Sequence, residues 1–514
     1  MPTTDDVIRG LCPQPRQVQL SEDRCPLPPV LTWSGPAEIT DAITLLTRRL
    51  APALDVVPAP SHDAFLTATV DPAQPPEGYR IDIDTRIHIS CGDAQGTRWA
   101  IQTLLQLLTP WVYGPGPLRL ADLQLPQGTI VDQPHYPWRG AHLDVSRHFM
   151  PASFIMGFLD VLSMHKLNRL HLHLTDDQGW RLPVCGWPRL TTVGAWRPGT
   201  LRGHQPPPDT NDCDDVPDHD QIPHGGAYTI DELRAIDRHA RSLGITIVPE
   251  IDLPGHTESV VAAYPALGCG TPIDHPRTAF GVSEHHINLT DDALAFCRDA
   301  LDTVMDIFPT SPIHIGGDEC PGKEWFTHAP TRTRLATLDI TTPQQAQAWF
   351  EHHICDYLAA AGRQVIAWDE VLAAGAPEDV TVMVWRNADD IARAATAGHD
   401  VIAAPVRHTY LDYGIETGPQ APVTIAAPTT MDDVAGLHDV LAAVDSPHLL
   451  GGQFQLWTEY LRTPAQVEDA AFPRGTSIAE QLWTGNPARP LSDLEAQTRR
   501  LTAMGVNWHR MTRV

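Results

Sequence analysis

Short apolar segments alternate with amphipathic segments from residue 136 onward. The apolar segments are rich in β-branched residues and indicate strands, whereas the segments between them repeat apolar residues at helical spacing. The eight candidate strands are 140–146, 169–175, 245–251, 312–317, 364–369, 381–386, 400–405 and 452–457. Eight alternating strand and helix units predict an α/β fold in which a parallel sheet closes into a (β/α)8 TIM barrel.

Helix boundary signals support this division of the chain. Thr229 to Glu232 form a capping box ahead of an apolar stripe, and Gly244 is placed to end that helix. Thr342-Pro343 predicts a second helix start, and the Ser492 to Glu495 segment predicts the start of the last helix.

The first part of the chain has a different pattern. Two helical stripes flank short segments of alternating apolar and polar residues; the stripes are 38–50 and 95–108, and the alternating segments are 79–84 and 87–90. This pattern predicts a smaller α+β domain over residues 1–135, followed by the barrel over residues 136–514. A Pro- and Asp-rich stretch at 197–226 predicts a long loop on the top of the barrel.

Unusual residues follow the predicted strands at the barrel end where active sites occur. Asp318 and Glu319 come directly after two glycines, and tryptophans end strands five, six and eight at Trp368, Trp385 and Trp457. Carboxylates bind sugar hydroxyls and indole rings stack on sugar C–H surfaces, so this rim predicts a carbohydrate site. Consecutive side chains of a regular strand point to opposite faces, and the adjacent acids are therefore expected to have different tasks.

Charge and composition narrow the classes of partner. The formal charge is −27, from 63 acidic and 36 basic residues, which disfavours nucleic acid and anionic membranes. We see no apolar stretch long enough for a leader or a membrane span, and nine cysteines without a CxxC pair fit a reduced compartment. The expectation is a cytoplasmic protein, or a secreted one if a leader was removed.

The sequence predicts neither a metal nor an organic cofactor. The acidic loop at 212–220 lacks the glycine and glutamate of a calcium loop, and the histidine pairs at 285–286 and 352–353 are adjacent, so they do not share a helix face. The nucleotide and serine-hydrolase motifs GxGxxG, P-loop and GxSxG do not occur.

Eight segments along the barrel resemble the β-N-acetylhexosaminidases of glycoside hydrolase family 20, in the correct order. They are "LDVSRHF" (143–149), "HLHLTDDQGW" (171–180), "VPEIDLPGH" (248–256), "HIGGDEC" (314–320), "AWDEV" (367–371), "VWRN" (384–387), "TYLD" (409–412) and "LWTE" (456–459). The N-terminal segments "EGYRIDID" and "GTRWAIQTLLQLL" resemble the non-catalytic domain that precedes the barrel in many members.

The resemblance implies an exo-acting, retaining glycosidase that removes terminal β-linked N-acetylglucosamine, or N-acetylgalactosamine, from chitooligosaccharides or glycans. Catalysis in this family is substrate-assisted: the 2-acetamido oxygen attacks the anomeric carbon and forms an oxazolinium intermediate. Glu319 matches the general acid/base, Asp318 matches the residue that orients the acetamido N–H, and Tyr410 matches the hydroxyl that binds the acetamido oxygen.

The resemblance also assigns binding and supporting residues. Trp368, Trp385 and Trp457 match the pocket walls; the hydroxyl-binding residues are Arg147, Asp412 and Glu459; and the polar network behind the acid is Asp176, Asp252 and His256. Two departures from the family pattern affect the leaving-group side. The loop at 197–226 looks longer than in the simplest bacterial members, and strand six ends in Trp385-Arg386-Asn387, where family members often have a glycine.

Two alternatives stay open from the residues alone. One is a conventional two-carboxylate retaining glycosidase that uses Glu319 with Glu250 or Glu370, and the other is an inactive sugar-binding relative. The natural glycan, its linkage and the oligomeric state are not predicted.

Overall fold

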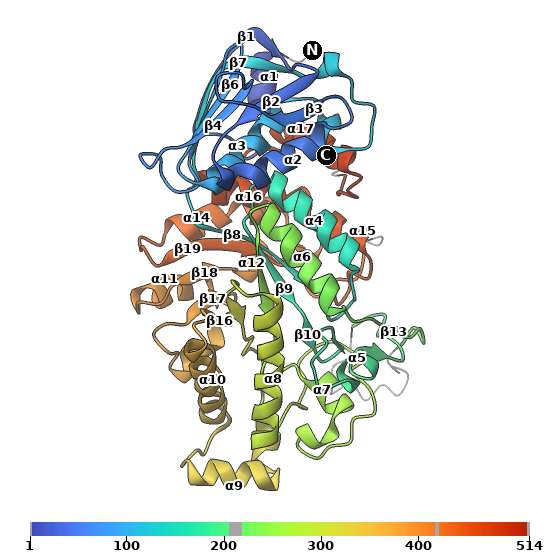
Figure 1. Cartoon of the computed structure of the whole chain (residues 1–514). Coiled ribbons are helices and arrows are strands. Elements are labelled where there is room, and N and C mark those ends of the chain that lie inside the picture. The colour runs from blue at the N-terminus through green and yellow to red at the C-terminus, as the bar shows by residue number, and fades with distance from the viewer. Residues whose placement is uncertain (1–2, 205–217, 417–420, 511–514) are drawn as a thin grey trace.

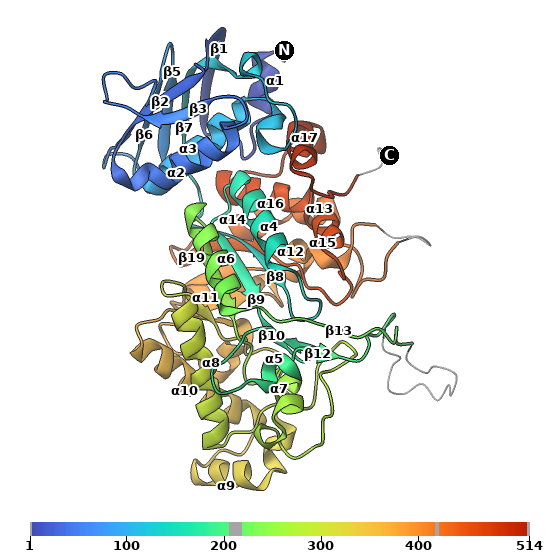
Figure 2. The same ribbon diagram turned by 45° about the vertical axis from the view of Figure 1, so that its right-hand side comes forward.

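The structure is a computed structural model that describes residues 3–204, 218–416 and 421–510, and it begins with a mixed seven-stranded sheet in the order β1-β7-β5-β6-β4-β2-β3. The strands are β1 (Gln17–Pro26), β2 (Val30–Ser34), β3 (Asp55–Pro58), β4 (Leu66–Val70), β5 (Tyr79–Ile83), β6 (Ile87–Cys91) and β7 (Gln124–Asp132). Helices α2 (Thr40–Leu50) and α3 (Ala94–Leu107) pack beside this sheet, as Figure 2 shows. The predicted α+β domain ahead of the barrel is confirmed.

Eight parallel strands then close into a barrel in the order β14-β15-β16-β17-β18-β19-β8-β9. They are β8 (Trp138–Asp144), β9 (Arg169–His173), β14 (Thr246–Glu250), β15 (Ile313–His314), β16 (Val365–Trp368), β17 (Thr381–Val384), β18 (Val401–Ala403) and β19 (Leu449–Phe454). Six of the eight predicted segments contain one of these strands, and the segments 140–146 and 452–457 overlap β8 and β19, which begin two and three residues earlier. The predicted TIM barrel is confirmed. The predicted division at residue 135 lies in the segment between β7 and β8.

The helices of the barrel part alternate with these strands or follow them (Figure 1). They are α4 (Ala152–Met164), α5 (Arg189–Thr192), α6 (Ile230–Ser242), α7 (Glu258–Ala263), α8 (Asp291–Ile307), α9 (Ala329–Thr337), α10 (Pro343–Ala360), α11 (Ala388–Thr396), α12 (Val406–Thr409), α13 (Met431–Ala435), α14 (Leu437–Ala442), α15 (Pro464–Ala471), α16 (Arg474–Thr484) and α17 (Glu495–Met504). A short helix, α1 (Thr4–Arg9), opens the chain, and small strand pairs lie at β10 (Thr175–Asp176) with β11 (Gly179–Trp180) and at β12 (Trp196–Arg197) with β13 (His224–Gly225). Among the described helices, none combines the length and apolarity that crossing a membrane requires.

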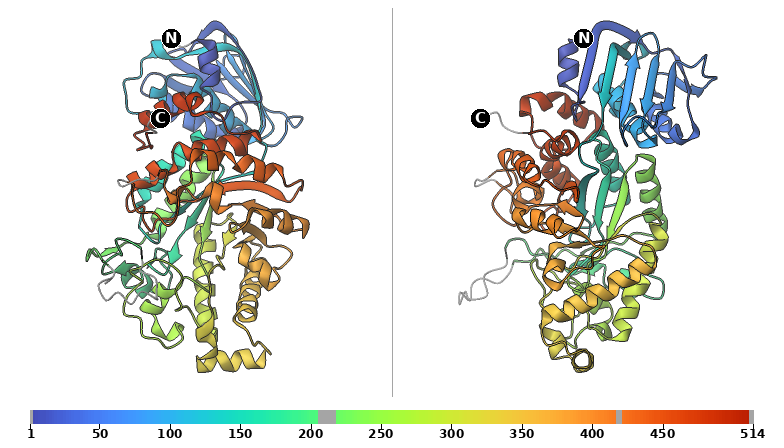
Figure 3. Two further views of the ribbon diagram at one scale, coloured as in Figure 1. Left: turned by 180° about the vertical axis from the view of Figure 1, so that it is seen from behind. Right: turned by 90° about the vertical axis from the view of Figure 1, so that its left-hand side faces the viewer.

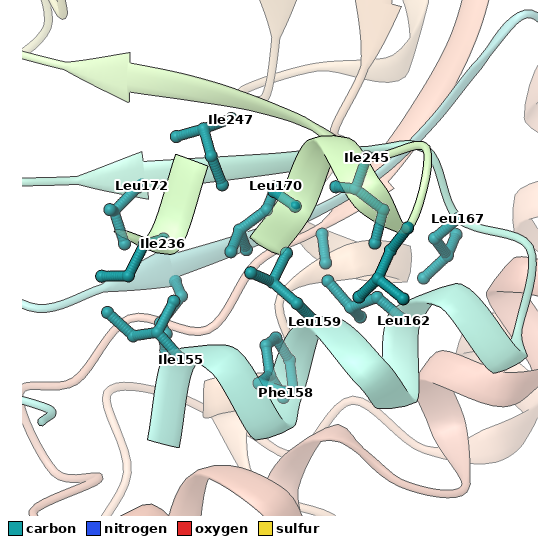
Figure 4. Packing of buried hydrophobic residues seen from close by; sticks show 14 of the residues in the cluster. Ile155, Phe158, Leu159, Leu162, Leu167, Leu170, Leu172, Ile236, Ile245 and Ile247 are labelled. Carbon is teal, nitrogen blue, oxygen red and sulfur yellow. The ribbon is translucent and has the colours of Figure 1, made fainter. Parts of the chain in front are cut away.

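Helices pack on the outside of the barrel through apolar stripes. Figure 4 shows Leu159 and Leu162 of α4 beside Leu170 of β9, and Ile247 of β14 close by. All four side chains are fully buried. Burying one such side chain stabilises the fold by about 1.5 to 3 kcal/mol, which is why the helical periodicity in the sequence was informative.

Capping chemistry explains where two of the predicted helices begin. Thr229 and Glu232 form the expected capping box at α6, and Thr342 accepts a hydrogen bond from the Gln345 backbone N–H at α10. α17 begins at Glu495, so the start of the last helix predicted in the Ser492 to Glu495 segment is confirmed. Ser492 itself lies in a turn of 3-10 helix over Leu491–Leu494, and α17 has no side-chain cap.

Figures 1 and 3 show the N-terminal domain (blue) at one end of the barrel part, beside the C-terminal helices (red). A buried ion pair joins the two parts. Lys166 Nζ lies 2.9 Å from Asp132 Oδ2 and donates to the Tyr79 hydroxyl oxygen at 2.7 Å. Trp483 of α16 donates its indole N–H to Asp132, and its ring centroid lies 4.4 Å from Lys166 Nζ. Lys166 and Asp132 are 1% and 2% exposed, so water does not replace either partner.

Lys166→Met is expected to lower the free energy of unfolding by about 3 kcal/mol, because Asp132 would stay buried without its cation. Chemical denaturation followed by circular dichroism measures this change. Lys323→Met is the matched control, since Lys323 pairs with Glu284 at the exposed surface. Equal stability of both variants would contradict the expectation.

Candidate active site

The adjacent acids lie in a turn and not on a strand. β15 ends at His314, and Gly316 and Gly317 take left-handed φ angles of +69° and +94°. A Cβ atom at Gly316 would lie 1.9 Å from Asp252 Oδ1, so no other residue fits this position. Glu319 itself has a φ of +45°, a strained conformation that is enriched at functional sites. The predicted strand to residue 317 is therefore too long.

A cavity of about 330 Å³ opens beside this turn, at the carboxyl ends of the barrel strands. It brings together eight of the predicted site residues: Arg147, Asp318, Glu319, Trp368, Trp385, Tyr410, Trp457 and Glu459. Its volume is near the lower end of the range for ligand pockets, about 300 to 1,000 Å³, and fits a small ligand.

The aromatic walls of the cavity are held by carboxylates behind them. Trp368 donates its indole N–H to Glu250 Oε1 at 2.9 Å, and Trp385 donates to Glu370 Oε2 at 3.1 Å. The ring centroids of Trp368 and Trp457 lie 6.0 Å apart. Neither Glu250 nor Glu370 lines the cavity, so their contacts suit a supporting task better than that of a nucleophile.

The Trp385 side of the cavity continues into Tyr410. The two rings are nearly parallel, at 26° and with centroids 6.3 Å apart, and the Tyr410 side chain is 6% exposed. Burial is the largest cause that raises the pKa of its hydroxyl well above the ordinary value, so this hydroxyl is a neutral donor.

Arg147 and Glu459 line one wall of the cavity, and Asp176 and Asp412 are buried acids outside its lining. Arg147 Nη2 lies 2.6 Å from Asp176 Oδ2, and Arg147 Nη1 lies 4.0 Å from Glu459 Oε1. Burial raises the pKa of Glu459 to about 7 and that of Asp412 well above its ordinary value. Both oxygens of Asp412 lack a partner among the described residues, although the side chain is 4% exposed. Buried acceptors of this kind are suited to receive hydrogen bonds from sugar hydroxyls.

His256 contacts both acids of the turn. Its Nε2 atom lies 3.6 Å from Glu319 Oε2 and 3.8 Å from Asp318 Oδ2, whereas its Nδ1 atom lies 3.3 Å from Asp176 Oδ1. Burial alone would lower the pKa of His256, but the surrounding carboxylates, Asp176 foremost, raise it well above the ordinary value. The side chain is therefore an imidazolium behind the two acids.

The two acids have opposite pKa shifts. The His256 N–H directed at the carboxylate is the largest cause that lowers the pKa of Glu319, and burial is the largest cause that raises the pKa of Asp318. Asp252 stabilises the turn, because its Oδ1 accepts the Gly317 backbone N–H at 3.2 Å. Adjacent residues in one turn thus have different environments, as two different tasks require.

Comparison with protein families matches residues 136–486 to "Glycosyl hydrolase family 20, catalytic domain" and residues 9–133 to "Glycosyl hydrolase family 20, domain 2". The chain belongs to glycosyl hydrolase family 20. This result confirms the predicted family and the predicted class of enzyme, a glycoside hydrolase.

Curated relatives and solved structures of family 20 match nearly the whole chain. The β-hexosaminidase of Porphyromonas gingivalis is 32% identical over 97% of this chain, and the chain spans 64% of the length of that relative. An exo β-N-acetylglucosaminidase from Vibrio harveyi, solved in complex with N-acetylglucosamine, superposes with a TM-score of 0.83 at 26% identity, covering 98% and 78% of the two chains. The N-acetyl-β-hexosaminidase of Streptomyces plicatus superposes with a TM-score of 0.80 at 28% identity, covering 99% and 97%.

Residues around the mouth of this family 20 site were not found by sequence reasoning. The cavity is also lined by Leu201, His204, Phe280, Gly281, Tyr413, Ile425 and Tyr460. Tyr413 ends the 3-10 helix Leu411–Tyr413, directly after the predicted Asp412, and Leu201 and His204 lie in the stretch 197–226 that was predicted as a barrel-top loop. The other four lie in segments without periodicity, so no local signal places them near Glu319. Of the acidic loop at 212–220, residues 212–217 lie outside the described residues, and Asp220 pairs with Arg462 at 3.2 Å.

One departure from the family pattern has a structural explanation. Asn387 accepts a hydrogen bond from the Asp389 backbone N–H at 3.2 Å and caps α11. Arg386 Nε lies 3.2 Å from Asp369 Oδ1 and 3.6 Å from Glu370 Oε1. Glu370 is the carboxylate that accepts the Trp385 indole N–H. The segment after β17 is therefore tied to the pocket wall.

Imidazoles and carboxylates also gather inside the barrel, below the cavity. His171, Glu250 and His314 offer ligand atoms within 4.8 Å of one another, and all three are fully buried. Both ring nitrogens of His173 make hydrogen bonds: Nδ1 lies 2.5 Å from Glu250 Oε2, and Nε2 lies 2.9 Å from Asp176 Oδ2. The contact with His173 orients Glu250, which in turn accepts the Trp368 indole N–H.

His256→Phe is expected to shift the alkaline limb of the kcat/KM profile upward by about one pH unit. The general-acid task expected of Glu319 requires its protonated carboxyl, so activity is expected to fall as pH rises through its pKa, which His256 lowers. Initial rates on an aryl N-acetylglucosaminide across pH measure the limb. His62→Phe, at an exposed histidine, is the control, and an unchanged or downward-shifted limb would contradict the expectation.

Proposed function

We propose that this chain removes single terminal β-linked N-acetylglucosamine or N-acetylgalactosamine residues from the non-reducing ends of chitooligosaccharides or glycans, with retention of configuration. The observation that carries the proposal is the tryptophan-walled cavity, which has Asp318 and Glu319 side by side in the turn next to it. The Vibrio harveyi relative is named as an exo enzyme and holds N-acetylglucosamine, which supports the same size of ligand here.

The reaction needs only one protein acid at the leaving oxygen. The 2-acetamido oxygen of the substrate attacks the anomeric carbon, the glycosidic bond breaks, and Glu319 gives its proton to the leaving oxygen. Asp318 accepts the acetamido N–H and stabilises the positive charge of the oxazolinium ring. Water then attacks the anomeric carbon, gives a proton to the Glu319 carboxylate, and reopens the ring to the acetamido group.

Exposure of the two acids fits these tasks. The Glu319 side chain is 38% exposed and can meet a leaving group at the mouth, whereas the Asp318 side chain is 14% exposed and lies deeper. The Tyr410 hydroxyl donates to the acetamido oxygen in this scheme. In this scheme Arg147 and Glu459 of the cavity lining, with the buried Asp412 near Glu459, bind the other sugar hydroxyls, as exo cleavage at a chain end requires.

Rates on two aryl glycosides with the same leaving group test the proposal. An aryl N-acetylglucosaminide carries the acetamido nucleophile and the matching aryl glucoside does not, so we expect a rate ratio of at least about 10³. An N-acetylglucosamine-derived thiazoline, which resembles the oxazolinium ring, should inhibit. Comparable rates on both glycosides would favour the two-carboxylate alternative, and binding without turnover would favour a sugar-binding relative.

A further inference from the structure

A buried glutamate lies behind the catalytic turn without a place in the scheme above. Glu351, on α10, is 1% exposed and does not line the cavity. Its Oε1 atom accepts a hydrogen bond from Gln347 Nε2 at 2.8 Å, and its Oε2 atom has no partner among the described residues. An apolar residue would fill this position without the desolvation cost of a carboxyl group.

The Glu351 carboxyl packs against the backbone that positions Asp318. Gln347 Nε2 also donates to the Gly317 carbonyl oxygen, at 2.6 Å. Gly317 has a φ of +94°, and a Cβ atom there would lie 3.0 Å from Glu351 Oε1. Gln347 therefore links the glutamate to the residue immediately before Asp318. Asp318 Oδ1 is likewise buried and without a partner in the described part of the chain.

The groups that face Glu351 provide no positive charge. Asp318 and the Cys320 thiol face it from the catalytic turn, and the Cys355 thiol faces it from its own helix. No ion pair of Glu351 occurs among the described residues. Burial is the largest cause that raises the pKa of Glu351 to about 7, and the Asp318 charge raises it as well. Below that pH, Glu351 is a neutral acid behind an Asp318 that the reaction needs ionised.

We propose that Glu351 and Gln347 are positioning residues for Asp318: they brace it through Gly317, and the neutral Glu351 acid keeps a second negative charge away from it. This inference rests on the proposed function, because it assigns Asp318 the task of orienting the acetamido group. When Glu351 ionises, two carboxylates repel each other across the turn, and the acetamido group is held less well.

Glu351→Gln separates the charge from the shape, because glutamine has the same size and is neutral at every pH. We expect a wild-type to Glu351→Gln ratio of kcat near one below about pH 6, falling to about one tenth at about pH 8. The loss of the Glu319 proton with rising pH affects both proteins and cancels in the ratio. A ratio that stays flat from about pH 5 to about pH 9 would overturn the charge part of the proposal.

A second test variant, Gln347→Ala, keeps the proposal falsifiable if Glu351→Gln is unstable, and Asp356→Asn is the control. Gln347→Ala removes the donor to the Gly317 carbonyl and is expected to lower kcat by about tenfold at all pH values, with a smaller change in KM. An unchanged kcat would overturn the bracing part. Asp356→Asn neutralises an exposed acid of the same helix and should leave the wild-type profile unchanged. Wild type can discriminate between the two aryl glycosides while Glu351→Gln and Gln347→Ala show none of the expected changes in kcat. In that case only this inference is overturned, and the proposed function stands.

Discussion

Glu319→Gln is expected to lower kcat on an unactivated aryl N-acetylglucosaminide by about 10³-fold, the largest loss of activity from a single substitution in this site. Glutamine keeps the size of the side chain but has no acidic proton for the leaving oxygen. His256 Nε2, 3.6 Å from Glu319 Oε2, remains in place as an imidazolium, but it lies behind the acid.

A series of aryl leaving groups tests the assignment. A leaving group of low pKa departs without a proton, so the loss in Glu319→Gln should shrink as that pKa falls, whereas binding of N-acetylglucosamine should persist. Glu284→Gln, at an exposed acid that pairs with Lys323, is the matched control and should behave as wild type. A loss of the same size for every leaving group would assign another task to Glu319.

Asp318→Asn is expected to lower kcat by about 10²- to 10³-fold through the loss of a charge that stabilises the oxazolinium ring. Asparagine can still accept the acetamido N–H, so binding of the substrate should change much less than kcat. Removing the carboxylate also relieves its repulsion with the neighbouring acids, because burial and the Glu319 charge raise the pKa of Asp318.

Inhibition and leaving-group dependence distinguish Asp318→Asn from Glu319→Gln. The thiazoline inhibitor should lose affinity in Asp318→Asn, since a protonated thiazoline carries the positive charge that Asp318 stabilises. The loss of kcat should not depend on the leaving group, unlike that of Glu319→Gln. Asp356→Asn serves as the control for neutralising an acid. Unchanged thiazoline affinity would contradict the task given to Asp318.

The barrel could be predicted because its strands have local signals. Each strand is a short buried run, and each helix between strands repeats apolar residues on one side, so a window of a few residues is informative. Errors came at element ends. The predicted strand through Gly317 stops at His314, because backbone conformation at an end depends on tertiary contacts such as that of Gly316 with Asp252.

The site could be predicted as far as its residues follow the strands. Trp368 ends β16 and Trp385 directly follows β17. The barrel topology alone therefore brings them close to the acids after β15. Their supports were not predictable in this way. The sequence suggests Glu370 only as a nucleophile of the two-carboxylate alternative. Its contact with the Trp385 indole N–H depends on the packing of two neighbouring strands, which the sequence does not show.

The sequence by itself determined the fold, the family and the residue types at the rim, since apolar periodicity and motif order are properties of local segments. Only the tertiary structure decided how Asp318 and Glu319 share one turn. Left-handed glycines and a strained Glu319 place two adjacent acids in different environments, with His256 contacting both and Glu351 packed behind the first. Burial and contacts between distant segments shift the pKa values of these groups, and neither burial nor those contacts can be read from local sequence.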